Sequence, residues 1–183
     1  SNSSFTVAEN QTSAATITVT DADNDSISFS LSGTDADSFA IASSGALTFN
    51  NAPDYETKES YSLIVSASDG TSSVSQTISI NISNVNEVPQ ISALSSTHSP
   101  DENQTSIVTV SASDPDANTS LTYSLSGTDS SLFDISSSGV LTFKSAPDYE
   151  TPGDADADNS YQINVIVSDG SLSVTQAITI QVQ

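Results

Sequence analysis

The chain has 183 residues, no cysteine, and 23 acidic side chains against 2 basic ones, for a formal net charge of −21 at pH 7. This charge disfavours nucleic acid and anionic membrane surfaces as partners, because binding to either needs clustered basic residues. Because the chain has no cysteine, disulfides and thiol chemistry are excluded. No apolar run is long enough to span a bilayer, so direct membrane insertion is not expected. Cations are the expected counterpart, since uncompensated negative charge opposes compaction.

Polar and apolar residues alternate in several segments of the first half of the chain. The clearest segments are residues 16–20, 27–31, 63–65 and 78–82. A period of two is typical of half-buried antiparallel strands, and clusters of Asp, Asn, Gly and Pro separate the segments at the spacing of an all-β sandwich. No segment has helical periodicity. The pattern predicts a Greek-key β-sandwich of about seven strands.

The sequence is also internally repeated. Four blocks recur in the same order: Glu-Asn-Gln-Thr at 9–12 and 102–105, Ser-Leu-Ser-Gly-Thr-Asp at 30–35 and 124–129, Ala-Pro-Asp-Tyr-Glu-Thr at 52–57 and 146–151, and Ser-Asp-Gly at 68–70 and 168–170. The second copy carries an insertion between Thr151 and Ser160. The repeat predicts a duplication, with one all-β sandwich in residues 1–86 and a second in residues 87–183.

A short polar segment, Asn84-Val85-Asn86-Glu87-Val88-Pro89, joins the two copies. Its low apolar content and final Pro are typical of a connector between domains. Asn and Glu side chains and extended backbone carbonyls are the oxygen ligands that calcium prefers. The sequence therefore predicts a calcium-binding linker at residues 84–89.

Glu9, the Asp21-Ala22-Asp23 turn, the Asp54-Tyr55-Glu56 motif and this linker together resemble a cadherin repeat. Nearly the whole chain is similar to two such repeats in tandem, of the kind found in large bacterial surface adhesins of the RTX type. The resemblance implies that calcium ions bind between successive domains. By position, their ligands would be Glu9, Asp54, Glu56, Asn84, Asn86, Glu87, Asp114, Asp116, Asn118 and Asp169.

Two departures from the family pattern bear on this centre. Asn84 stands where the family usually has Asp, and the linker is shorter than in animal cadherins. We therefore expect roughly one to three ions, with backbone carbonyls of Asn86 and Asn118 contributing.

The same mapping gives a half-site at each outer end of the pair. The first, toward an upstream repeat, comprises Asp21, Asp23 and Asp69. The second, toward a downstream repeat, comprises Glu102, Asp148 and Glu150. The insertion adds alternating acids that predict an accessory calcium loop, namely Asp154, Asp156 and Asp158. This loop is not an EF-hand, because Asn159 and Val165 replace the required Gly and Glu.

Any one of these Asp residues could instead cap backbone amides in a turn. Calcium is favoured because the acids recur together in both copies, flank one linker and lack basic partners. An enzyme is not expected, since the acids repeat with the domain, whereas an active site would occur once. The single His98 aligns with Phe5 of the first copy and is predicted to lie on the first strand of the second domain.

A calcium-dependent carbohydrate-binding module is the main alternative, because some calcium-binding β-sandwiches bind glycans. Sugar platforms need exposed aromatic side chains, whereas every aromatic here except Phe5 recurs in both copies, as core or corner positions do. We therefore expect extracellular or cell-surface extender repeats of a large adhesin, rigidified by calcium. The expected partners are adjacent repeats of the same chain. Partners on other cells would be like repeats, through homophilic adhesion, or glycans.

Overall fold

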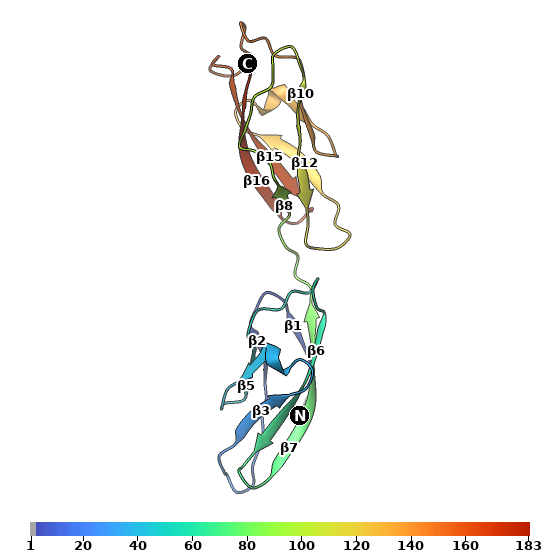
Figure 1. Ribbon diagram of the computed structural model, residues 1–183, viewed down its shortest axis with the longest axis vertical. Helices are drawn as coiled ribbons and strands as arrows, with labels where there is room; N and C mark the ends of the chain where they lie inside the picture. The colour runs from blue at the N-terminus through green and yellow to red at the C-terminus, as the bar shows by residue number, and fades with distance from the viewer. Residues whose placement is uncertain (1–2) are drawn as a thin grey trace. The chain divides into compact units, whose positions relative to one another are not determined.

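The computed structural model describes residues 3–183 and shows an all-β protein whose only helical segments in that range are two short 3-10 turns. The chain forms two compact units, unit 1 ending at Val85 and unit 2 comprising Asn86–Gln183. Each unit is a β-sandwich (Figure 1). The division falls one residue before the predicted domain boundary. Between residues 3 and 183, no helix has the length and apolar character needed to cross a membrane.

Unit 1 is a sandwich of a four-stranded and a three-stranded sheet. Its strands are β1 (Ser4–Ala8), β2 (Ser13–Thr16), β3 (Ser28–Ser32), β4 (Phe39–Ile41), β5 (Ala46–Phe49), β6 (Ser60–Ser68) and β7 (Ser73–Ser83). The sheet orders are β1-β7-β6-β3 and β2-β5-β4, with β1 parallel to β7 and the other pairs antiparallel. This is the predicted Greek-key sandwich.

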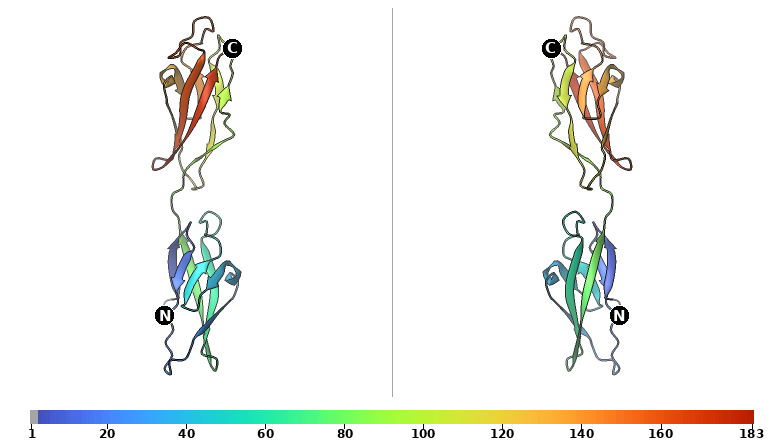
Figure 2. Two further views of the ribbon diagram at one scale, coloured as in Figure 1. Left: turned by 90° about the vertical axis from the view of Figure 1, so that its left-hand side faces the viewer. Right: turned by 90° about the vertical axis from the view of Figure 1, so that its right-hand side faces the viewer.

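Unit 2 repeats this arrangement, with its first and second strands each divided in two. Its strands are β8 (Gln90–Ser92), β9 (Thr97–His98), β10 (Ser106–Thr109), β11 (Ser111–Ser113), β12 (Thr122–Ser126), β13 (Phe133–Ile135), β14 (Val140–Phe143), β15 (Ser160–Ser168) and β16 (Ser173–Gln181). The sheets have the orders β12-β15-β16-β9, β10-β14-β13 and β11-β8. Figure 2 shows the strands of each unit from two further sides. His98 pairs with β16 as Phe5 pairs with β7, which confirms its predicted position on the first strand.

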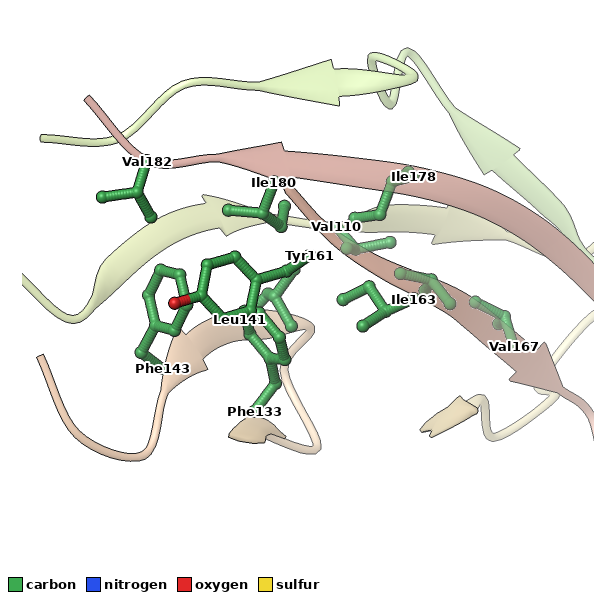
Figure 3. Packing of buried hydrophobic residues seen from close by; sticks show 11 residues of the cluster. Val110, Phe133, Leu141, Phe143, Tyr161, Ile163, Val167, Ile178, Ile180 and Val182 are labelled. Atoms are coloured by element: carbon green, nitrogen blue, oxygen red, sulfur yellow. The ribbon is translucent and has the colours of Figure 1, made fainter. Parts of the chain in front are cut away.

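An aromatic triplet lies in the core of each sandwich. In unit 2, the rings of Phe133 and Phe143 lie 4.5 Å apart, and Tyr161 meets them edge-on at 5.7 and 5.2 Å (Figure 3). Such tilted and edge-on contacts are the favourable arrangements of aromatic pairs. Unit 1 repeats the triplet with Phe39, Phe49 and Tyr61. These repeated aromatics are therefore core residues, as their recurrence predicted.

One repeated aromatic differs between the units. Tyr55 is half-buried and packs against the core of unit 1, whereas Tyr149 is 48% exposed. The insertion follows Thr151, two residues after Tyr149, and the side chain of Asn159 donates a hydrogen bond of 2.9 Å to the Tyr149 carbonyl. Tyr149 is thus not a core residue. Its position recurs in both copies, but its burial does not.

The predicted strand at residues 16–20 is wrong beyond Thr16, where β2 ends. The carbonyl of Ile17 lies against Gly45, and that of Val110 lies against Gly139 in the same place of unit 2, so Ile17 and Val110 are equivalent. In unit 2 the residues that follow Val110 form β11, because β8 pairs with them. Within residues 3–85, no strand lies beside residues 18–20 to pair with them.

Candidate metal centre

Glu9 is a buried acid at the end of unit 1 from which the chain continues into the linker. It is 3% exposed, and its two carboxylate oxygens each accept a backbone hydrogen bond of 2.7 Å, from the N–H of Tyr55 and the N–H of Val85. Glu9 therefore ties the end of β1 to the Asp54-Tyr55-Glu56 turn and to the linker. A carboxylate with charge-assisted hydrogen bonds of this kind is held in one position.

Two further predicted ligands lie beside Glu9 in unit 1. Glu56 brings a carboxylate oxygen within 4.8 Å of one of Glu9. The side-chain amide of Asn84 donates a hydrogen bond of 2.9 Å to Glu56, so the linker begins against this acid. Asp54 caps the same turn, accepting a hydrogen bond of 3.0 Å from the N–H of Thr57. The structure thus places Glu9, Glu56 and Asn84 together, whereas Asp54 caps the adjoining turn.

Unit 2 gathers its predicted ligands around the other half of the linker. Asp116 accepts a hydrogen bond of 2.8 Å from the N–H of Glu87 and donates its own N–H to Asp114 at 2.9 Å. The amide of Asn86 donates to Asp169 at 2.8 Å. The Oδ2 atom of Asp114 is buried and has no hydrogen-bond partner among the described residues. A buried, unpartnered carboxylate oxygen is costly unless a cation meets it.

Asp169 caps a turn with one carboxylate oxygen and faces the linker with the other. Its Oδ1 caps its own turn through the N–H of Leu172 at 2.6 Å, while Oδ2 faces Asn86. The hydrogen bond from Asn86, followed by those from the turn, lowers the pKa of Asp169 below its usual value. Asp169 is therefore charged at neutral pH with one oxygen directed to the linker. Asn118, with a positive φ of 64°, turns the loop that follows Asp116.

The outer half-sites are assembled to different degrees. In unit 2, Glu102, Asp148 and Glu150 bring carboxylate oxygens within 4.8 Å of one another. Glu102 accepts the N–H of Tyr149 at 2.8 Å, as Glu9 accepts that of Tyr55.

In unit 1, the acids of the other half-site cap turns. Asp21 accepts the N–H of Asp23 at 2.9 Å. Hydrogen bonds from the backbone N–H groups of Ser72 and then Thr71 lower the pKa of Asp69. Capping of turns thus accounts for the contacts of Asp21 and Asp69, whereas the half-site of unit 2 is a cluster of acids.

The insertion forms a third group of close acids. Asp154, Asp156 and Asp158 bring oxygens within 4.8 Å of one another. The pKa of Asp156 is raised by its hydrogen bond with Asp154 and by the charge of Asp158. Burial opposes ionisation of Asp154, but hydrogen bonds led by the N–H of Asp158 outweigh it and lower the pKa of this carboxyl. Asp154 accepts that N–H at 2.8 Å.

A buried acid outside the predicted ligand set is Asp129, which is 5% exposed. It holds the insertion to the sandwich, because it accepts the N–H of Ala155 at 3.0 Å and that of Gln162 at 2.7 Å. Its recurrence at the end of the Ser-Leu-Ser-Gly-Thr-Asp block was the only sequence signal for this role.

The donor set around the linker fits calcium. It consists of carboxylate, amide and carbonyl oxygens, which calcium binds with six to eight ligands in flexible geometry. The chain's two lysines, Lys58 and Lys144, lie against Asp35 and Asp134 and not against these acids. Close carboxylates without a basic partner repel one another unless a divalent cation joins them.

Two Greek-key sandwiches in tandem, with clusters of acids beside the segment that joins them, define a tandem-repeat β-sandwich protein. The cadherin domain matches residues 3–83 and 96–183, and the chain belongs to the cadherin family. Cadherin domains are non-enzymatic extracellular adhesion modules, and this confirms the prediction that the chain is not an enzyme.

Solved cadherin structures resemble the whole chain. Repeats EC1-2 of human protocadherin-24 match at 22% identity and a TM-score of 0.69, over 99% of this chain and 94% of that one. Repeats EC22-24 of mouse cadherin-23 match at 26% identity and a TM-score of 0.62, over 100% of this chain and 63% of that one. Repeats EC1-4 of Drosophila N-cadherin match at 19% identity and a TM-score of 0.62, over 99% and 47%. No curated protein matches the chain.

Proposed function

We propose that the chain is a pair of calcium-binding extender repeats of a large secreted or cell-surface adhesin, of the RTX type found on bacteria. Calcium would hold successive repeats in a defined orientation and so project a distant binding module. Membership of the cadherin family supports the adhesion role, and the acids beside the linker support the calcium role.

The observation that carries the proposal is how the linker is shared. Its first residues, Asn84 and Val85, are bonded to acids of unit 1. Its next residues, Asn86 and Glu87, are bonded to acids of unit 2. Because Val85 and Asn86 are consecutive, an ion bound by either set of acids restrains the linker from that side.

Apolar packing holds the linker only at its last residue, Pro89, whose side chain is fully buried. Val85 is 42% exposed and Val88 is 45% exposed, so neither provides an apolar anchor. The exposed hydrogen bonds of Asn84 and Asn86 contribute little net free energy, whereas ions that bring several charged ligands together contribute through their binding affinity. We infer that calcium, and not apolar packing, fixes the conformation of residues 84–88.

Calorimetric titration of the metal-free chain with calcium tests this proposal. Glu87→Ala and Asp116→Ala should each weaken the tightest site by about tenfold or more, a loss of about 1.4 kcal/mol or more. The matched control is Asp37→Ala, which removes an exposed acid outside every predicted site and should leave the affinity unchanged. Equal losses in all three variants would show that general charge is being measured, and would contradict the proposed site.

A further inference from the structure

The insertion of unit 2 has no counterpart in unit 1, and it is fixed to its own sandwich. Near its start, the N–H of Gly153 donates a hydrogen bond of 3.2 Å to the Tyr161 hydroxyl. At its end, the side-chain amide of Asn159 donates one of 2.9 Å to the Tyr149 carbonyl. The contact with Asp129 described above lies between these two. The insertion is therefore held in place by residues of unit 2 alone.

Three carboxylates meet inside the insertion. Asp154, Asp156 and Asp158 each bring one oxygen within 4.8 Å of the others, and Asp154 is only 7% exposed. Both lysines of the chain lie against other acids. Carboxylates this close repel one another unless a proton or a cation joins them. Close acids are common on protein surfaces, however, and do not by themselves identify a ligand.

A buried amide oxygen beside these acids does point to a ligand. Asn159 is 9% exposed, and its Oδ1 has no hydrogen-bond partner among the described residues. Its backbone N–H donates to Asp154 at 3.2 Å, so Asn159 adjoins the three carboxylates. The hydrogen bond from its Nδ2 to Tyr149 fixes the amide, and residues 3–183 alone enclose Oδ1. A buried polar oxygen without a partner is costly unless a donor or a cation meets it.

We propose that the insertion binds one calcium ion inside unit 2, through a carboxylate oxygen of each of its three acids and through Oδ1 of Asn159. This is the accessory loop predicted from the sequence, with the buried amide added as a ligand. The hydrogen bonds that Asp154 accepts leave lone pairs for the ion, since a carboxylate has about four acceptor sites. Carboxylate and amide oxygens suit calcium, whereas zinc prefers the sulfur and imidazole ligands that this segment lacks.

This site needs no residue of another repeat. All the ligands belong to residues 154–159, whereas the linker site takes its ligands from two units, so the proposal does not rest on calcium at the linker. The ion also acts beyond the insertion through Asn159. Tyr149, whose carbonyl Asn159 holds, lies between Asp148 and Glu150. Calcium in the insertion therefore restrains the turn that carries two acids of the outer half-site.

An NMR titration of the metal-free chain with calcium chloride tests the proposal, because each backbone amide reports its own binding midpoint. We expect saturable shift changes at residues 154–159. Asp156→Asn should raise the midpoint at these residues by about tenfold or more, since the charge of the ligands tunes calcium affinity. Asp156 is exposed, so the variant is compatible with folding. The matched control Asp134→Asn, at an exposed acid of unit 2 outside the insertion, should keep the parent's midpoint.

A linker variant separates this site from the proposed function. Glu87→Ala should leave the midpoint at residues 154–159 unchanged, and Asp156→Asn should leave the shift changes at residues 84–89 unchanged. Either proposal can thus fail while the other stands.

Three results would overturn the inference. The first is no saturable shift change at residues 154–159, or the same midpoint in the parent and in Asp156→Asn. The second is a midpoint for magnesium chloride equal to that for calcium chloride, which would contradict the assignment of the ion. The third is a shift change at these residues that Glu150→Gln abolishes and Asp156→Asn retains, because the ion would then belong to the outer half-site.

Discussion

One acid has a different second partner in each of the two units. Asp35 in unit 1 and its counterpart Asp129 in unit 2 each accept a backbone N–H at 2.7 Å, from Ser62 and Gln162. With the other oxygen, Asp35 forms an ion pair with Lys58, whereas Asp129 accepts the backbone N–H of Ala155. Ala155 belongs to the insertion, so the added residues supply a hydrogen bond where the first copy has a lysine. In both units the protein itself compensates this charge.

The acids beside the linker also accept hydrogen bonds from the backbone, but neither lysine of the chain lies against them. Asp114 differs from Asp35 and Asp129 because it keeps a buried oxygen with no partner among the described residues. The comparison therefore separates acids whose two oxygens the fold satisfies from a linker acid with an unsatisfied oxygen, which the proposed calcium ion would meet.

Removing calcium should have the largest effect, because it removes the only cation expected at the acids beside the linker. At free calcium about a hundredfold above the dissociation constant, one site adds about 2.7 kcal/mol. For a domain of this size that shifts the melting midpoint by roughly 10–20 °C. Magnesium should protect poorly, since it demands a tighter octahedral site. Thermal melts in calcium, magnesium and chelator measure this effect, and identical melting midpoints would contradict the proposed calcium sites.

A smaller effect should separate Glu9 from its counterpart Glu102. Glu9 accepts two backbone N–H groups and is 3% exposed, so Glu9→Gln leaves one buried N–H facing an amide donor. This should cost roughly 1–3 kcal/mol. Glu102 accepts the N–H of Tyr149 and is less buried, and Glu102→Gln should cost under about 1 kcal/mol. Denaturant unfolding in chelator measures both without the metal. A larger cost at Glu102 would contradict the assignment of Glu9 as the buried anchor of the linker.

The smallest effect should come from breaking the compensation inside unit 1. The hydrogen bond from Lys58, with that from Ser62, lowers the pKa of Asp35. A lowered pKa stabilises the fold above the usual Asp value near 4, and that contribution is lost as the pH falls through the folded pKa. Lys58→Met should therefore reduce the stability of unit 1 at neutral pH and flatten its acid dependence below about pH 4.

Lys144→Met serves as the matched control, because the Lys144–Asp134 pair is exposed and 3.9 Å long. Exposed pairs of this kind contribute little to stability. Acid titrations of the unfolding midpoint would contradict the account if the Lys58 and Lys144 variants behaved alike.

The sequence predicted the strands whose pairing partners lie inside the same copy. Alternation located β3 to within a residue and fell inside β6 and β7. It failed at residues 18–20, because alternation shows that a segment can form a strand but not that a neighbour is present to pair with it. In unit 2 the neighbour is β8, and the equivalent residues are a strand.

The candidate site was predictable in its members but not in its internal contacts. The repeat and the resemblance identified Glu9, Asp54, Glu56 and the linker, and the structure places Glu56 and Asn84 beside Glu9 within unit 1. Neither could show that Glu9 is almost fully buried, or that Asp129 holds the insertion. Both facts depend on which backbone N–H groups the fold places within hydrogen-bonding distance of a carboxylate, and no sequence pattern predicts that.

Small-angle scattering of the chain in calcium and in chelator tests the central claim most directly, with circular dichroism recorded alongside. Each sandwich has its own aromatic core, so strand content should stay nearly constant when calcium is removed. The scattering in calcium should fit one orientation of the two units, and the scattering in chelator should require a broad distribution, because the linker acids then repel without a counterion. An equally narrow distribution in chelator would show that packing, and not calcium, fixes the linker, and would contradict the account.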